Sequence, residues 1–167
     1  MTPPQASAPQ PSDEATGVGS GSQGQDSGAA VRVACGAEIE LALVTGPTSE
    51  VPFPARLTYT QADPYAVRLH CQTGPRTTVT WVLSRETLSQ GLEGPSGLGD
   101  VHVCPVPGPG RSTVLITLGT GVDAALLRGD SGVIRRFLTL SAAVVPPGEE
   151  DRHLDLDALI AHLRQAP

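Results

Sequence analysis

Residues 54–92 have the sequence PARLTYTQADPYAVRLHCQTGPRTTVTWVLSRETLSQGL, and this stretch decides the fold. Large apolar residues occupy alternate positions over residues 65–71 and again over residues 79–83, with mostly polar or small residues between them. A period of two is typical of antiparallel strands with one buried face. Turns are indicated at Asp63-Pro64 and at Thr73-Gly74-Pro75, because proline fixes φ and glycine accepts a positive φ. The stretch therefore predicts consecutive strands, in which Trp81 shares the core-facing side with its apolar neighbours.

A short helix is predicted directly after the last of these strands. Ser84 is a good N-cap residue, and Glu86 in the first turn complements the helix dipole. Leu88 is expected to face the core, and Gly91 is expected to be the C′ residue that ends the helix.

Upstream, residues 31–43 alternate in the same way and predict one long strand with a bulge at Gly36. Gly46-Pro47 indicates a turn, and a second strand is expected after Pro52-Phe53-Pro54. This second strand carries Leu57 and Tyr59.

Downstream, a glycine-rich loop is expected at 94–99, followed by strands at 100–104, 112–118 and 122–127. The proline-rich residues 105–110 are expected to lie outside any strand. Asp130 or Ser131 is predicted to cap a helix whose apolar stripe includes Phe137. A last amphipathic helix is predicted at 156–163, with Asp155 as its cap. The result is an α+β fold with antiparallel sheets in a ββββα-βββα order and a C-terminal amphipathic helix.

Composition divides the chain into two parts. Residues 1–30 are rich in Pro, Gly, Ser and Gln and lack aromatic residues, which predicts a disordered tail. Residues 31–167 are expected to form the folded domain. The net charge is −6, which disfavours a nucleic-acid-binding protein because phosphate contacts require basic surface. Three widely spaced cysteines, no signal peptide and no long apolar run predict a cytoplasmic protein without a membrane span.

No motif predicts an enzyme, a cofactor or a metal. Gly129-Asp130-Ser131-Gly132 resembles a serine-protease motif as a string, but it fits a helix start better. The glycines at 19, 21 and 24 follow no strand, so they do not indicate dinucleotide binding. His70, His102 and Cys104 are too few for a closed zinc site. The acids of residues 149–151 are expected to be a solvated linker.

Several motifs, taken in order, resemble the SsgA-like proteins of actinobacteria over about residues 31–163. They are Val51-Pro52-Phe53-Pro54-Ala55, Leu57-Thr58-Tyr59, Ala62-Asp63-Pro64-Tyr65-Ala66-Val67, Val79-Thr80-Trp81-Val82-Leu83-Ser84-Arg85, Gly91-Leu92, Gly99-Asp100-Val101-His102-Val103, Arg136-Phe137-Leu138, Val145-Pro146-Pro147-Gly148 and Leu154-Asp155-Leu156-Asp157. The chain departs from the family pattern at Cys71 and Cys104, where aromatic residues are expected.

The resemblance implies a whirly-like fold assembled as a homotrimer. It also implies a non-enzymatic adaptor that regulates sporulation-specific cell division. Such an adaptor helps select septum sites, recruits the tubulin-like division GTPase and guides the peptidoglycan machinery, so it would be recruited to the septum. The alternative is a single-stranded nucleic-acid-binding protein, since other whirly folds bind such ligands.

Protein interfaces favour exposed aromatic residues and arginine. We therefore expect the protein-contact residues among Tyr65, Arg68, Arg85, Arg135 and Arg136.

Overall fold

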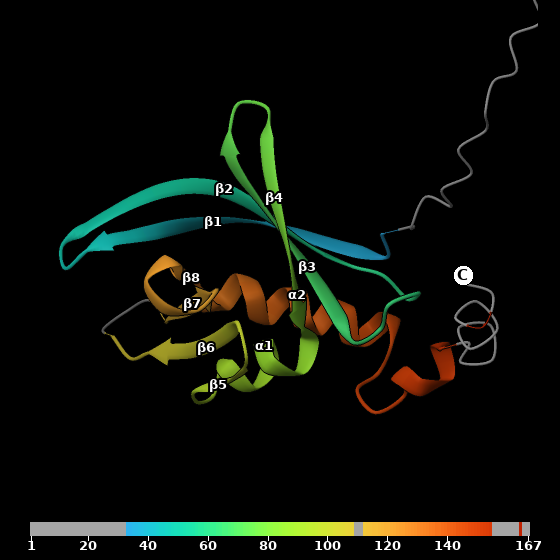
Figure 1. The fold of residues 1–167 in the computed structure, drawn as a ribbon. Coiled ribbons are helices and arrows are strands. Elements are labelled where there is room, and N and C mark those ends of the chain that lie inside the picture. Colours follow the sequence, from blue (N-terminus) through green and yellow to red (C-terminus); the bar gives the residue numbers. More distant parts are fainter. Residues whose placement is uncertain (1–32, 109–111, 155–163, 165–167) are drawn as a thin grey trace, which may run out of the picture. The chain divides into compact units, whose positions relative to one another are not determined.

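The computed structural model describes residues 33–108, 112–154 and 164, all within the unit Val31–Pro167. The elements, in chain order, are β1 (Cys35–Gly46), β2 (Ser49–Tyr59), β3 (Ala66–Gly74), β4 (Thr77–Ser84), α1 (Arg85–Gly91), β5 (Ser96–Leu98), β6 (Val101–Val106), β7 (Thr113–Leu118), a 3-10 turn (Gly121–Asp123), β8 (Ala125–Asp130), α2 (Ser131–Val144) and a second 3-10 turn (Glu150–His153) (Figure 1). The predicted tail, Asp155 and the predicted helix at 156–163 lie outside the described residues.

Within the described residues, the eight strands belong to one antiparallel sheet rather than to several sheets. Their order across the sheet is β4-β3-β2-β1-β8-β7-β6-β5, so β1 and β8 join the two halves. The predicted ββββα order is correct for the first half, and the second half has four strands instead of three. The added strand is β5, in the expected glycine-rich loop. Gly97 lets β5 approach β6, because a Cβ there would lie 2.3 Å from the Val101 carbonyl oxygen.

Two strands include prolines that were predicted to lie outside them. β2 includes Pro52 and Pro54, and β6 includes Pro105, which was expected to lie in a loop. β3 pairs with β2 only at residues 55–59, and β5 pairs with β6 only at residues 101–103. The prolines therefore have a single neighbouring strand, and their missing N–H groups remove no bond to a second one.

Two glycines have roles that differ from the prediction. The β1–β2 register is continuous through Gly36, and its irregularity lies between Val44 and Gly46, beside the turn. Gly91 is the last residue of α1 and not a left-handed C′ residue, since Leu92 is the cap. A Cβ on Gly91 would lie 2.4 Å from Val103, so glycine is needed here for helix–sheet packing.

The core lies between the sheet and the two helices. Strand residues at alternate positions are buried, as the period of two predicted, and they include Leu57, Leu69 and Ile116. Leu88 of α1 and Phe137 of α2 are fully buried against them. The core is completed by residues of the same kind, which are Ile39, Leu41, Tyr59, Val67, Leu83, Leu92, Val103, Val114, Leu118, Leu127, Ile134 and Val145. Trp81 is partly buried and packs against this core.

Candidate functional site

A cleft lies between α1, the second half of α2 and residues 147–151, and its volume is about 750 Å³. We call it the Arg85 cleft. Three of the five predicted contact residues line it, namely Tyr65, Arg85 and Arg135. Apolar parts of its wall come from Leu92 and Leu138.

The start of α1 places Arg85 in this cleft. Ser84 is the N-cap, as predicted, and its hydroxyl accepts a hydrogen bond from the Thr87 backbone N–H over 3.2 Å. Arg85 is therefore the first helical residue after β4, and its backbone N–H donates to the Tyr65 carbonyl over 2.8 Å. Its side chain turns into the domain and is only 7% exposed.

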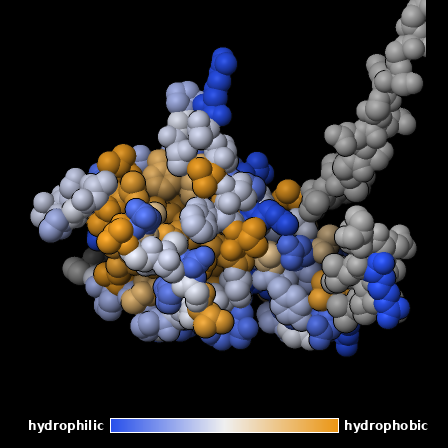
Figure 2. Space-filling model, in the orientation of Figure 1, coloured by the Kyte–Doolittle hydropathy of each residue, from blue (hydrophilic) through white to orange (hydrophobic). Residues whose placement is uncertain are grey.

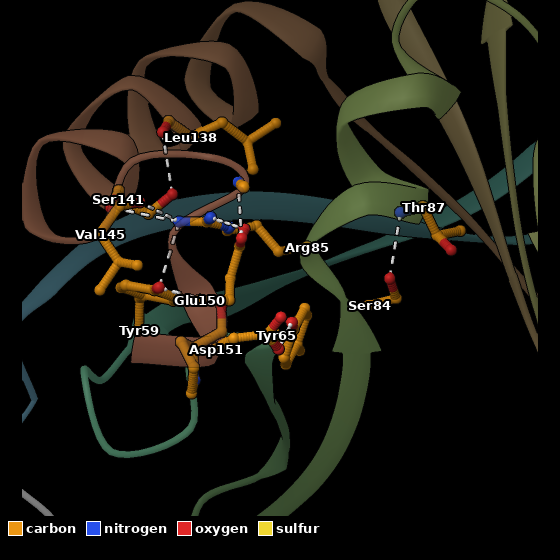
Figure 3. A network of polar contacts seen from close by, with 12 residues as sticks. Tyr59, Tyr65, Ser84, Arg85, Thr87, Leu138, Ser141, Val145, Glu150 and Asp151 are labelled. Atoms are coloured by element: carbon orange, nitrogen blue, oxygen red, sulfur yellow. Dashed lines mark hydrogen bonds and ion pairs between the residues drawn. The ribbon is translucent and has the colours of Figure 1, made fainter. Parts of the chain in front are cut away.

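Arg85 connects four parts of the domain through its guanidinium group, as Figure 3 shows. It donates to the Val145 carbonyl over 2.7 Å, to the Ser141 carbonyl over 3.4 Å and to Tyr59 Oη over 3.1 Å. It forms a short ion pair with Glu150. Its Cζ atom also lies 5.2 Å from the centre of the Tyr59 ring, a cation–π distance.

Residues 146–153, which we call the strap, follow α2 and are held by polar contacts to the domain (Figure 3). Glu150 binds Arg85 with one oxygen and accepts from the Gly148 N–H with the other over 2.6 Å. The Tyr65 hydroxyl donates to Asp151 Oδ1 over 2.6 Å. Gln61 Nε2 lies 3.0 Å from His153 Nδ1. The strap is therefore fixed at three of its residues.

These contacts shift the pKa values of side chains in and beside the Arg85 cleft. The hydrogen bond to Asp151 raises the pKa of Tyr65 to about 12. The pKa of Glu150 is lowered, chiefly by its own backbone N–H, with Arg85 and the Gly148 N–H acting in the same direction. Burial raises the pKa of the Tyr59 phenol. Glu150 is thus ionised at neutral pH, whereas Tyr65 and Tyr59 stay protonated, so none of these three groups is poised for proton transfer near pH 7.

The structure places the predicted contact residues in different settings. Arg68 pairs with Asp63 over 3.0 Å, and Arg135 pairs with Glu93 over 2.7 Å. Arg136 is exposed on α2. Arg68 and Arg136 do not line the Arg85 cleft. Arg85 itself differs from the expectation of a surface contact, because its donors are used within the domain.

Asp130, Ser131 and His70, which belong to motifs considered for catalysis or metal binding, make contacts within the domain. Asp130 caps α2, as predicted, and its carboxylate accepts from the Gly132 N–H over 2.7 Å, while Ser131 Oγ donates to the Ser112 carbonyl over 2.7 Å. His70 lies between two threonine hydroxyls, each 2.9 Å away. Within residues 33–108, 112–154 and 164, no group of three or more His, Cys, Asp and Glu side chains could hold a metal ion. None of the helices described is both long and apolar enough to cross a membrane.

Comparison with known families identifies the chain. The model of the family described as "Streptomyces sporulation and cell division protein, SsgA" matches residues 53–150. The chain belongs to the SsgA family. The match includes β3, β4, α1 and α2, and with them Tyr65, Arg85 and the strap as far as Glu150.

Curated relatives of this SsgA-family chain are sporulation-specific cell division proteins named SsgB. The protein from Streptomyces coelicolor is 43% identical over 126 residues, which are 75% of this chain and 92% of the relative. The protein from Kineococcus radiotolerans is 44% identical over 128 residues, or 75% and 77% of the two chains.

Solved structures of relatives share the fold. A structure from a study of SsgB in sporulating Streptomyces coelicolor has a TM-score of 0.68 at 42% identity, covering 71% of this chain and 94% of the other. The SsgA-like protein from Thermobifida fusca has a TM-score of 0.70 at 32% identity, covering 77% and 93%. The mostly antiparallel sheet with two helices seen in the described residues is therefore shared with these SsgA-like structures.

Sequence reasoning missed two residues of the cleft. Glu150 and Asp151 were both predicted to be part of a solvated linker, which is wrong for Glu150 because its side chain is 12% exposed and pairs with Arg85. Asp151 is exposed as predicted, but it also accepts a hydrogen bond from Tyr65. A run of three acids after a Pro-Pro-Gly turn carries no local signal of these partners, which lie far away in the sequence. The two cysteines at expected aromatic positions also differ from each other, since Cys71 is buried in the core and Cys104 is half-buried.

Proposed function

We propose that this SsgA-family protein acts in sporulation-specific cell division as a non-enzymatic adaptor. The observation that carries this proposal is the 43% identity to an SsgB protein over 92% of that protein's length. In the Arg85 cleft, Arg85 is paired with Glu150 and the Tyr65 hydroxyl donates to Asp151, an arrangement suited to holding a surface rather than to a reaction. The family is described by a role in sporulation and cell division and not by a reaction.

The finer parts of the proposal follow from the family. The protein would be recruited to the septum, help select its site, and bind the tubulin-like division GTPase and the peptidoglycan machinery. It would act as a homotrimer of whirly-like domains. Tyr65, Arg135 and Arg136 are offered as contact residues because each has an exposed side chain near α1 and α2, and Arg68 is a further candidate at the β3 surface.

Localisation tests the adaptor role. A fluorescent fusion expressed in sporulating hyphae of Streptomyces coelicolor is expected to form a ladder of septal foci before septa close. A uniform signal throughout septation would sink the proposal. Charge reversal of Arg136 to Glu is expected to weaken the foci, while the same reversal at Arg56, which is exposed on β2, is the matched control.

The mass of the purified protein tests the assembly. Sedimentation equilibrium is expected to give three times the chain mass of 17.2 kDa. A monomer over the full concentration range would contradict the homotrimer while leaving the septal role open.

A further inference from the structure

One edge of the sheet is an open, uncharged strand. β4 ends the sheet at one side, and among the described strands it pairs only with β3. Its eight residues, TTVTWVLS, contain neither a charge nor a proline. Soluble proteins usually protect such an edge with charges, prolines or very short strands, because its free N–H and C=O groups can pair with another chain. The opposite edge follows this rule, since β5 has only three residues.

An apolar trough begins at the same strand. Its volume is about 640 Å³, and it is lined by side chains that share apolar or uncharged character. The lining residues are Leu43, Val51, Pro52, Phe53, Pro54, Cys71, Gln72, Thr73, Gly74, Pro75, Val79, Trp81, Leu118, Ala125 and Leu127. Figure 2 shows hydrophobic side chains gathered on the face of the domain below the β1–β2 and β3–β4 hairpins. Val79 and Trp81 of β4 form one wall of the trough, beside the open edge.

The two features are connected by strand geometry. A strand added to β4 would lie about 4.8 Å from it, and its side chains would alternate between the two faces of the sheet. Side chains on one face would lie beside Val79 and Trp81 and extend over the trough. Those on the other face would lie beside Val82, which is 57% exposed. An added strand would thus gain main-chain hydrogen bonds and apolar burial together.

We propose that β4 binds, by strand addition, an extended segment of a partner protein with apolar side chains at alternate positions. The segment would be uncharged at those positions, because no charged residue lines the trough or lies in β4, and a charge buried there would remain unpaired. This inference rests on the proposed adaptor function for its biological meaning, and it adds a second contact surface to the residues proposed near α1 and α2.

A separate segment fits this surface better than a second copy of β4 does. In an antiparallel pair of two β4 strands, the Val79 and Trp81 side chains of the second copy would already form the wall of their own trough. They would therefore leave this trough open, whereas a partner segment with free apolar side chains would fill it.

The test selects ligands on the full-length protein from a phage-displayed library of random eight-residue peptides. The consensus is expected to have apolar residues at alternate positions. Synthetic copies of the selected peptides are then titrated, with the fluorescence of Trp81 as the readout because it is the single tryptophan of the chain. A blue shift that saturates at one peptide per chain is expected, since the peptide would cover Trp81.

Val79→Lys places a charge at the edge of the trough and is expected to weaken peptide binding by about tenfold or more. Val122→Lys is the matched control because Val122 is 100% exposed on the turn before β8, and binding should be unchanged. Urea midpoints equal to that of the unsubstituted protein verify folding, and Val82→Lys provides a second variant on the other face of β4.

Three results would overturn the inference. The first is a peptide consensus with helical spacing, or no enrichment of any peptide. The second is unchanged peptide binding to the folded Val79→Lys variant. The third is self-association that Val79→Lys abolishes, which would make a second copy of the chain the occupant.

The fluorescent septal fusion distinguishes failure of the strand-addition inference from failure of the proposed function. Septal foci that persist in Val79→Lys would refute strand addition as the mode of recruitment and leave the septal role intact. Diffuse signal from the unsubstituted protein would refute the septal role, while the peptide titration still decides the strand-addition site.

Discussion

Replacement of Arg85 by methionine tests whether this residue holds the domain together. Methionine keeps a long unbranched side chain but removes every donor of the guanidinium. The Val145 carbonyl then loses its hydrogen bond of 2.7 Å, and the Ser141 carbonyl loses a weaker one of 3.4 Å. Val145 and Ser141 are both fully buried while Arg85 is present, so the substitution leaves two buried carbonyls without this donor.

The magnitude follows from these two carbonyls. Hydrogen bonds to a charged donor contribute about 1.5–3 kcal/mol each, and the bond to Ser141 is long enough to contribute only part of this. We therefore expect Arg85→Met to lower the free energy of unfolding by about 2–4 kcal/mol. Loss of the ion pair with Glu150 acts in the same direction. Arg85→Lys keeps the charge but not the planar fork, so it should recover only part of the loss.

Urea unfolding followed by Trp81 fluorescence measures the effect. Arg135→Met is the matched control, because the Arg135 side chain is 58% exposed and its pair with Glu93 is solvated. This control should cost about 1 kcal/mol or less. Equal unfolding free energies for Arg85→Met and the unsubstituted protein would show that the buried network does not stabilise the fold.

Three other substitutions probe separate features. Gly91→Ala should destabilise the protein by about 1–3 kcal/mol in urea unfolding, because the new Cβ would overlap Val103. The energy cost of this overlap should exceed the gain from the higher helix propensity of alanine. Asp130→Ala should lower the free energy of unfolding by about 1 kcal/mol, because it removes the N-cap of α2. Asp130→Asn should retain most of the capping stability, and equal losses in the two variants would argue that capping is not the role of Asp130. Glu150→Gln should lower the urea midpoint at pH 7 and lose its effect in acid. The lowered pKa of Glu150 gives stability above the unfolded-state pKa that disappears as pH falls through the folded pKa. A difference between the two proteins that is constant from pH 7 to pH 3 would contradict this assignment.

Local chemistry predicted much of the fold. The alternation in β3 and β7 gave the buried residues correctly, whereas in β4 only Leu83 is buried, Trp81 is partly buried and Val79 is exposed. The caps at Ser84 and Asp130 begin helices as expected. The errors came from long-range pairing. Pro105 lies in a strand because β6 has one open side at that point, and β5 exists because Gly97 permits contact with β6. Neither fact is visible in the neighbouring residues.

The contacts within the Arg85 cleft were harder to predict from the sequence than the strands and helices. Tyr65 and Arg135 were selected as exposed contact residues and lie at the Arg85 cleft. Arg85 was selected for the same reason, yet its side chain is buried, because Glu150 and the α2 carbonyls approach it from distant parts of the chain. Residue type and spacing cannot report such partners, since burial of arginine depends on what the rest of the chain supplies.

The pairing of β1 with β8 has a consequence for how the chain is made. Leu41 pairs with Gly129, so the centre of the sheet joins residues far apart in the sequence. On the ribosome, β1–β4 emerge first and can pair as hairpins, but the second side of β1 remains open until β8 follows. Long-range pairing of this kind slows folding. The nascent chain therefore exposes two unpaired strand edges at once, and synthesis interrupted before β8 would release an intermediate prone to aggregation.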